Sequence, residues 1–219
     1  MRENGPKAKI GYAIFDLDGT LVDNLDIIVK SFNYAVRDFV GREFSRMEVY
    51  SRFGPTLEQM VEDTVPKQDA SEAVKRYHEY YRKFFRQYAN VYPGIPDLIS
   101  GLQSAGVILS VCTASDARMT KTTLEGSGLG DMFSILITAD DVSRLKPDPE
   151  GLSRATVLMG GRPELTVYLG DSVRDIEASR RAGISSAAVL WGFGDEGQLR
   201  AQNPDFILRD PTEALIQLT

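Results

Sequence analysis

The sequence predicts an α/β protein in which a doubly wound, mostly parallel sheet carries an inserted all-helical domain. From residue 91 onward, short apolar segments alternate with segments of helical periodicity, as in parallel strands joined by crossover helices. Residues 25–88 instead carry helical patterns and no convincing strand. We therefore expect a core domain of residues 10–21 and 90–219, a helical domain of residues 22–89, and a loose leader of residues 1–9.

The expected strands are short and apolar. The first, Ile10–Phe15, is mostly apolar, which is typical of a strand covered on both faces of a parallel sheet. The others, in chain order, are residues 107–112, 135–138, 166–169, 187–190 and 206–208. Helices are expected between them, with Gly106 and Gly183 at the ends of two and with Asp148 and Pro149 at the start of another.

Four helices are expected in the inserted domain. Apolar residues recur at three- and four-residue steps from Leu25 to Phe39, which gives one helix an apolar face. A short helix is expected within residues 46–53, and Thr56 with Gln59 matches a capping box for a helix through about residue 65. Ser71 is expected to cap a long helix rich in aromatic residues, whose spacing favours the core of a small bundle over a ligand-stacking surface.

Composition argues against several classes of function. The formal net charge of −6 and the lack of a basic run argue against nucleic acid or an anionic membrane as the main partner. No apolar segment reaches the length of a membrane span, and the N-terminus lacks the apolar region of a signal peptide. The single cysteine, Cys112, cannot form an internal disulfide. We therefore expect a soluble, cytoplasmic protein.

Histidine contributes little to the expected chemistry. The single histidine, His78, lies among charged neighbours and is expected at a solvated helix position. General acid–base chemistry would then depend on carboxylates.

Carboxylates and a lysine follow several of the predicted strands. Asp16 and Asp18 come directly after the first strand, Lys146 follows the short strand at residues 135–138, and Asp171 and Asp175 follow the strand at residues 166–169. The carboxyl ends of parallel strands meet at one edge of a sheet, where ligands bind. Carboxylates gathered there would raise one another's pKa unless a cation offsets their charge. Oxygen ligands without cysteine or histidine favour a hard cation, and Mg²⁺ fits best.

Each feature alone has a simpler interpretation. The acids after the first strand are also typical of a polar Asp-Gly turn. Thr113, at the end of the strand at residues 107–112, could cap the next helix, and Lys146 could be a surface lysine. Ser172 and Asp175 resemble a capping box, which would make Asp175 structural. The case for a functional site depends on the features occurring together, in order, at one edge of the sheet.

Four segments resemble the four motifs of the haloacid dehalogenase-like (HAD) hydrolases. They are Asp16–Asp23, Thr113, Lys146-Pro147 and Gly170–Asp175, and the resemblance extends from about residue 10 to the C-terminus. The inserted helices resemble the small cap of the subgroup that contains phosphoglycolate phosphatase, a pyrophosphatase and β-phosphoglucomutase. The segments Gly54–Leu57 and Tyr92–Pro96 look most like the phosphatase and pyrophosphatase members.

The resemblance implies a role for each motif residue. Asp16 would attack phosphorus to give an aspartyl-phosphate, and Asp18 would protonate the leaving alcohol and later take a proton from water. The Asp16 carboxylate and the Asp18 backbone carbonyl would also bind Mg²⁺. Asp171 would be a further Mg²⁺ ligand, with Asp175 a direct ligand or a partner that orients one.

The remaining motif residues would hold the phosphate. Thr113 and the backbone amide of Ala114 would bind phosphoryl oxygens at a helix N-terminus. Lys146 would bridge Asp16 and the phosphate and offset charge. The cap would close over the site and select the leaving group.

The expected reaction is Mg²⁺-dependent hydrolysis of a small phosphorylated metabolite. We expect 2-phosphoglycolate first, with pyrophosphate and small sugar phosphates as alternatives. Arg52, Gly54 and Thr56 lie where a cap loop could reach the site, and Arg52 could meet a substrate carboxylate or be a solvated cation at a helix end.

Other classes of function remain open. A phosphoryl-transfer mutase would use the same core, whereas a dehalogenase would need neither Mg²⁺ nor the second acid. A receiver-like signalling domain and a catalytically silent regulatory protein are the non-enzyme alternatives. Both a monomer and a homodimer are compatible with the sequence.

Overall fold

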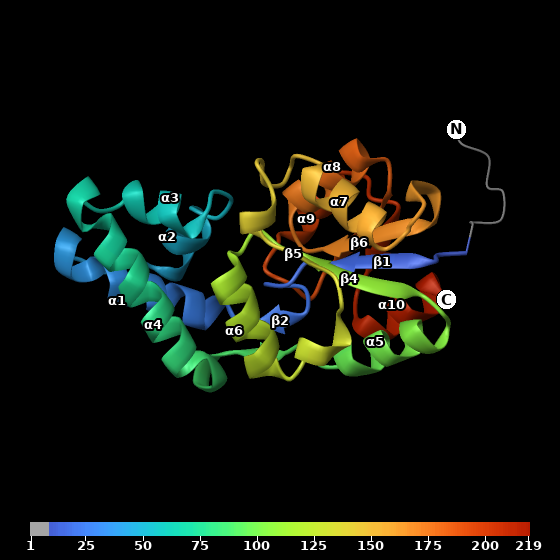
Figure 1. The fold of residues 1–219 in the computed structure, drawn as a ribbon, viewed down its shortest axis with the longest axis horizontal. Helices are drawn as coiled ribbons and strands as arrows, with labels where there is room; N and C mark the ends of the chain where they lie inside the picture. Colours follow the sequence, from blue (N-terminus) through green and yellow to red (C-terminus); the bar gives the residue numbers. More distant parts are fainter. Residues whose placement is uncertain (1–8) are drawn as a thin grey trace.

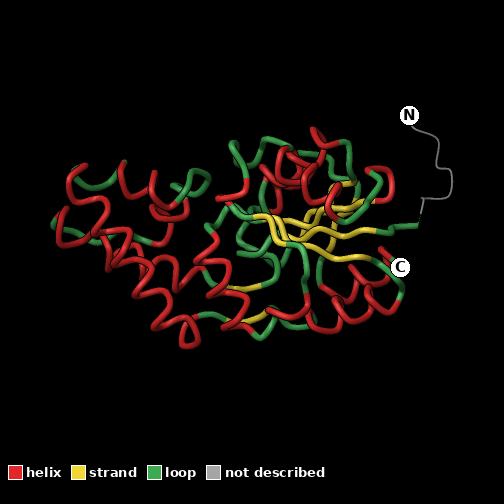
Figure 2. The backbone as a smooth tube through the Cα atoms, viewed as in Figure 1, coloured by secondary structure: helices red, strands yellow, loops and turns green. Residues whose placement is uncertain are grey.

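The predicted doubly wound, mostly parallel sheet is confirmed, and all six of its strands are parallel. The computed structural model describes residues 9–219, so the predicted leader lies outside the described residues except for Lys9. The strand order is β5-β4-β1-β6-β7-β8. The strands are β1 (Tyr12–Phe15), β4 (Ile108–Cys112), β5 (Leu136–Ile137), β6 (Thr166–Gly170), β7 (Ser185–Val189) and β8 (Phe206–Leu208). Figure 2 shows the sheet as the yellow layer between helices.

The register of the central strands brings their carboxyl ends together. Phe15, the last residue of β1, is paired with Val111 of β4 on one side and Leu169 of β6 on the other. The chain therefore leaves all three strands at nearly the same level. Polar residues that follow these strands are placed at one edge of the sheet, where α/β proteins bind ligands.

Helices cover both faces of the sheet (Figure 1). One face carries α7 (Glu150–Leu158), α8 (Val173–Ala182) and α9 (Glu196–Ala201). The other carries α5 (Ile95–Ser104), α6 (Ala117–Ser127) and α10 (Pro211–Leu218). Short 3₁₀ helices occur at residues 67–69, 130–132, 139–141 and 163–165.

The inserted helices lie beyond the carboxyl edge of the sheet, at the left of Figure 1. They are α1 (Leu25–Val40), α2 (Arg46–Tyr50), α3 (Leu57–Glu62) and α4 (Ala70–Tyr88). The predicted aromatic core is present, because Tyr77, Tyr81 and Phe85 of α4 are buried and pack with Phe32 of α1 in one apolar cluster. Apolar side chains buried in this way are the main stabilising contribution to a small bundle.

A small antiparallel sheet joins the inserted helices to the core. It consists of β2 (Val22–Asp23) and β3 (Asn90–Val91), and Val22 pairs with Val91. Two-residue strands carry no periodicity that a sequence pattern reveals. The chain thus enters and leaves the inserted helices side by side.

Several local expectations are corrected by the structure. Helix α4 begins at Ala70, with Asp69 at the N-cap position, so Ser71 lies inside the helix and does not cap it. Helix α7 begins at Glu150, one residue later than expected, and Pro149 is at its N-cap position. The Asp148 carboxylate still accepts a hydrogen bond from the Glu150 N–H at 3.0 Å. Strand β7 starts at Ser185, two residues earlier than expected. The polar Ser186 can lie in the strand because its N–H and hydroxyl both donate hydrogen bonds to the Asp205 carboxylate.

His78 is buried, not solvated. Its side chain is 7% exposed and lies 3.6 Å from the Asp116 carboxylate. The charged neighbours Lys75, Glu79 and Arg82 are exposed, whereas the His78 ring lies beside Asp116, a residue far away in the chain. Among residues 9–219, no helix combines the length and apolarity needed to cross a bilayer.

Candidate active site

The turn after β1 places two carboxylates at the carboxyl edge of the sheet. Asp16 is buried, and its Oδ1 accepts a hydrogen bond from the Leu17 N–H at 2.8 Å. Asp18 follows in a tight turn that Gly19 completes with a φ of +81°. A Cβ at Gly19 would overlap the carboxylate of Asp171, so this close approach requires glycine.

Lys146 joins the acids that follow β1 and β6. Its Nζ lies 2.9 Å from Oδ2 of Asp16 and 2.7 Å from Oδ1 of Asp175. It also donates to the Tyr168 hydroxyl at 2.7 Å, and that hydroxyl donates to the Cys112 carbonyl at 2.9 Å. Burial by itself would lower the pKa of Lys146, but the two carboxylates outweigh burial and raise it. Lys146 is therefore a fixed positive charge and not a surface lysine.

Three buried carboxylates share the site. Oxygens of Asp16, Asp171 and Asp175 all lie within 4.8 Å of one another. Burial raises the pKa of Asp16 well above its usual value, and Lys146 only partly opposes this. Burial, followed by the charge of Asp175, raises the pKa of Asp171 to about 7. One lysine therefore leaves an excess of negative charge, and an oxygen-only donor set fits a hard divalent cation.

Asp175 has fewer free acceptor positions than its partners. Its Oδ2 accepts from the backbone N–H of Ser172 at 2.8 Å and from the Ser172 hydroxyl at 2.6 Å, while Oδ1 accepts from Lys146. The capping box expected for α8 is present, with Ser172 at the N-cap. Asp175 thus both starts α8 and orients Lys146. Asp171 is held differently, through a 2.7 Å hydrogen bond from the Phe193 N–H to its Oδ2.

Asp18 is held by a chain of polar side chains. Its Oδ2 accepts from the Ser115 hydroxyl at 2.6 Å, and its Oδ1 accepts from the Asn24 amide. The same amide donates to the Tyr81 hydroxyl at 2.9 Å, which lies 2.8 Å from the Thr123 hydroxyl. This hydrogen-bond network links Asp18 to α4 of the inserted helices and to α6 of the core.

Thr113 and Ala114 follow β4 and line the same cavity as the carboxylates. The Thr113 hydroxyl accepts from the Ser115 N–H at 3.1 Å. Thr113 does not cap α6, because that position belongs to Asp116, whose carboxylate accepts from the Met119 N–H at 2.8 Å. Thr113 therefore lines the cavity from the turn between β4 and α6.

A cavity of about 380 Å³ lies between the core and the inserted helices. Its core wall carries polar residues that follow the strands, namely Asp16, Asp18, Thr113, Ser115, Lys146 and Asp171, whereas Asp175 lies behind this wall. Its other wall is mostly apolar and is formed by Ile28, Tyr50, Phe53, Leu57, Met60 and Tyr77. The cavity can therefore hold a small molecule with one strongly anionic end.

The three predicted contact residues of the inserted helices fall in different places. Gly54 lines the cavity, whereas Arg52 and Thr56 are absent from its lining. The Arg52 guanidinium lies 4.9 Å from the centre of the Phe44 ring. The Thr56 hydroxyl accepts from the Gln59 N–H at 3.3 Å and caps α3.

Sequence reasoning missed a second cationic side chain in the cavity lining. Arg174 of α8 reaches across the cavity, and its guanidinium donates to the Phe53 carbonyl. A Cβ at Gly54 would overlap this guanidinium. Arg174 lies inside the Gly170–Asp175 motif, so the sequence alone could have placed it near the site.

The loop after β7 was also missed. The Trp191 indole donates to the Thr20 carbonyl at 2.9 Å, and a side chain at Gly192 or Gly194 would overlap Asp171. This loop therefore contacts both the turn after β1 and Asp171. Gly192 and Gly194 follow a predicted strand, and this pattern could have indicated a tight loop beside the site.

Comparison with known proteins gives consistent matches over most of the chain. Residues 13–189 match the haloacid dehalogenase-like hydrolase family. Pyrophosphatase PpaX from Bacillus mycoides is 31% identical over 214 residues, covering 94% of this chain and 96% of that protein. The haloacid dehalogenase-like hydrolase SP0104 from Streptococcus pneumoniae superposes with a TM-score of 0.81 at 28% identity, covering 96% and 99% of the two chains.

A further solved structure is similar in fold. The crystal structure of a predicted phosphoglycolate phosphatase from Haemophilus somnus superposes with a TM-score of 0.88, covering 96% of this chain and 98% of that one. Its identity is 24%, so this similarity establishes the architecture and not the substrate.

Proposed function

The chain belongs to the haloacid dehalogenase-like hydrolase family, and we propose that it hydrolyses small phosphate monoesters through an aspartyl-phosphate on Asp16. The observation that carries the proposal is the Asp16 carboxylate, buried 2.9 Å from Lys146 on the core wall of a cavity that the inserted helices cover. A buried carboxylate fixed by one cation is suited to nucleophilic attack on an anionic group.

The proposed reaction has two steps. Asp16 attacks phosphorus, the bond from phosphorus to the ester oxygen breaks, and Asp18 gives its proton to the leaving alcohol. Water then attacks the aspartyl-phosphate while Asp18 takes one of its protons, which releases inorganic phosphate and restores Asp16. The hydrogen bonds from Ser115 and Asn24 support this role by fixing the Asp18 carboxyl group.

Residues that follow four strands of the sheet would hold the phosphoryl group and the cation that offsets its charge. Thr113 and the backbone amide of Ala114 would hold phosphoryl oxygens, and Lys146 would contact both Asp16 and the phosphate. Asp16, Asp171 and the Asp18 carbonyl would hold Mg²⁺, with Asp175 in an orienting role. When bound, the ion would neutralise negative charge on the phosphoryl group.

The cavity supports a small substrate with a second anionic group. Arg174 lines the same cavity as Lys146 and is a second cation there, and carboxylates and phosphates both pair well with guanidinium. We propose 2-phosphoglycolate as the first substrate to test, with its carboxylate toward Arg174. Pyrophosphate is the second candidate, because a relative at 31% identity is named a pyrophosphatase.

The test is a substrate panel measured with purified protein. Phosphate release from 2-phosphoglycolate, pyrophosphate, sugar phosphates and p-nitrophenyl phosphate is compared as kcat/KM, with and without Mg²⁺. A sugar phosphate supplied with its bisphosphate tests the mutase alternative. We expect Mg²⁺-dependent hydrolysis of monoesters, with 2-phosphoglycolate the best substrate. A clear preference for pyrophosphate would replace it with the second candidate.

Replacement of the nucleophile tests the mechanism separately. Asp16→Asn should reduce kcat by roughly 10⁴–10⁶-fold, as removal of a catalytic nucleophile does elsewhere. Mass spectrometry after an acid quench should find phosphate on Asp16 in the wild type. Asp97→Asn, an exposed acid of α5, is the matched control and should keep full activity. Turnover by Asp16→Asn close to wild type would refute the mechanism.

A further inference from the structure

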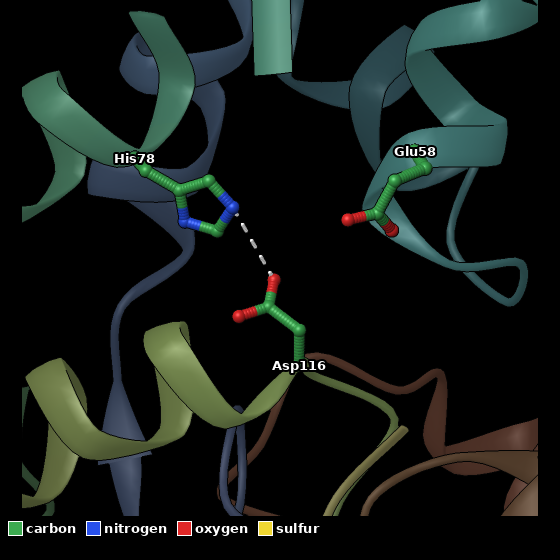
Figure 3. A group of neighbouring side chains, drawn as sticks. All are labelled: Glu58, His78 and Asp116. Atoms are coloured by element: carbon green, nitrogen blue, oxygen red, sulfur yellow. Dashed lines mark ion pairs between the residues drawn. The ribbon is translucent and has the colours of Figure 1, made fainter. Parts of the chain in front are cut away.

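A second group of potential metal ligands lies where the inserted helices meet the core (Figure 3). It consists of Glu58 on α3, His78 on α4 and Asp116 at the N-terminus of α6. Figure 3 shows the three side chains converging on a common point from three separate elements. None of the three belongs to the carboxylate cluster around Lys146.

The spacing of the group fits a metal ion better than direct pairing. One ligand atom from each residue lies within 4.8 Å of the other two. His78 Nε2 is 3.6 Å from Asp116 Oδ2, which is longer than a hydrogen bond. Two ligands bound about 2.1 Å from one tetrahedral zinc ion are ~3.4 Å apart. The imidazole and the carboxylate are therefore separated as two ligands of a shared ion would be.

A buried carboxylate oxygen without a hydrogen bond points into the group. Asp116 Oδ1 accepts from the Met119 N–H, but Asp116 Oδ2 is buried and makes no hydrogen bond with any residue in the range 9–219. The Asp116 side chain is 10% exposed and the His78 side chain 7%. Buried polar atoms normally have a partner, so this oxygen calls for an explanation. It is aimed at the His78 ring (Figure 3).

The protonation state of His78 suits a ligand. Burial lowers the pKa of His78, and the nearby Arg118 lowers it further, against the opposing charges of Asp116, Glu58 and Asp140. Asp140 is already used, because its carboxylate accepts from the Ala117 N–H at 2.9 Å.

We propose that Glu58, His78 and Asp116 form a binding site for a transition-metal ion, best matched by Zn²⁺. One imidazole nitrogen and two carboxylate oxygens are a donor set that Zn²⁺ accepts, with water in the remaining position. The nitrogen ligand distinguishes this site from the oxygen-only cluster, which favours Mg²⁺. Because Glu58 and His78 belong to the inserted helices and Asp116 to the core, a bound ion would tie the two parts together. This inference does not depend on the proposed substrate.

The single histidine makes the test specific. In untagged protein with Mg²⁺ in excess, every imidazole resonance belongs to His78. Adding one equivalent of Zn²⁺ should shift these resonances, and equilibrium dialysis should give one Zn²⁺ per chain. His78→Gln and Asp116→Asn should each weaken Zn²⁺ binding at least roughly tenfold, since loss of even an outer partner of a metal ligand costs that much. Glu62→Gln, an exposed acid one turn further along α3, should bind as the wild type does.

Two further variants keep the test decisive. Glu58→Gln changes an exposed side chain, so it should fold normally and still bind Zn²⁺ more weakly. Asp171→Asn removes a carboxylate of the other cluster and should keep the Zn²⁺-induced shift of His78. The proposal is overturned if Zn²⁺ leaves the His78 resonances unchanged, or if the Glu58 and His78 variants bind it as tightly as the wild type. Neither outcome bears on phosphatase activity, which is measured with Mg²⁺ alone.

Discussion

The Lys146 ammonium lies 2.9 Å from Oδ2 of Asp16, although the two residues follow different strands of the sheet. Asp16 comes from the turn after β1, whereas Lys146 comes from the loop between β5 and α7. Both side chains are about nine-tenths buried, so their charges are poorly screened by water. The positive charge of Lys146 therefore favours the ionised form of Asp16, which burial disfavours.

Lys146→Met should impair both stability and turnover. Removing one partner of a buried pair leaves uncompensated charge and typically costs about 3–5 kcal/mol of unfolding free energy. Burial raises the pKa of Asp16 and Lys146 opposes this, so without the lysine the pKa of Asp16 rises further. The attacking form is the carboxylate, so the rising limb of the pH–rate profile should move to higher pH. Chemical denaturation and kcat against pH measure both effects.

The matched control for this change is Lys121→Met. Lys121 is an exposed lysine of α6 whose partner, Glu125, is also exposed. It should alter the unfolding free energy by less than about 1 kcal/mol and leave the pH profile in place. If Lys146→Met keeps the wild-type profile, Lys146 does not govern the ionisation of Asp16.

Asp171 should make the metal-free protein less stable as the pH rises. Its folded pKa of about 7 lies above the value of about 3.9 expected when unfolded. The stability linked to its protonated form is fully present below about pH 4 and is lost as the pH rises through about 7. Mg²⁺ requires the carboxylate, so it should raise the melting temperature more at pH 8 than at pH 6.

Thermal unfolding with and without Mg²⁺ at these two pH values checks this prediction. Asp171→Asn removes the titrating group, so the difference between the wild type and the variant reports the contribution of Asp171 together with its effect on the pKa of Asp16. In the variant, the Mg²⁺-dependent rise in melting temperature should be small at both pH values. An equal rise at pH 6 and pH 8 in the wild type would contradict the assignment.

Arg174 should select substrates that carry a second negative group. Hydrogen bonds to charged groups contribute about 1.5–3 kcal/mol, so Arg174→Ala should lower kcat/KM for 2-phosphoglycolate roughly 10- to 100-fold. The effect on p-nitrophenyl phosphate should be much smaller, because its leaving group carries no second negative charge. Steady-state kinetics with both substrates measure the ratio. Arg180→Ala, on the same helix but exposed, is the control, and equal losses with both substrates would assign Arg174 a structural role only.

The sequence was sufficient to predict the residues at the strand ends but not those that meet them from elsewhere. Asp16, Lys146 and Asp171 could be placed together because parallel strands share a carboxyl edge. The burial of His78 could not be predicted, since the residues that cover it come from other helices. Arg174 was visible within a motif, but its contact with the Phe53 carbonyl depends on how the inserted helices dock. Periodicity predicts elements well and says little about contacts between them.

The hydrogen bond between Tyr81 and Asn24 gives the last prediction. The Asn24 amide donates both to Asp18 and to the Tyr81 hydroxyl, and that hydroxyl is anchored in turn by Thr123. All three supporting side chains are buried, so loss of the hydroxyl leaves Thr123 without this partner. Tyr81→Phe should therefore cost about 1–3 kcal/mol of unfolding free energy.

Tyr81→Phe should also lower kcat more than it changes KM, because Asn24 then holds Asp18 less firmly while the phosphate contacts are untouched. Asp18 gives and takes the proton in the proposed reaction, so the loss should be larger for substrates with a poor leaving group than for p-nitrophenyl phosphate. Tyr80→Phe, at the neighbouring and only partly buried position on α4, should leave both parameters unchanged. A uniform loss of activity with all leaving groups would mean that Tyr81 stabilises the fold without orienting Asp18.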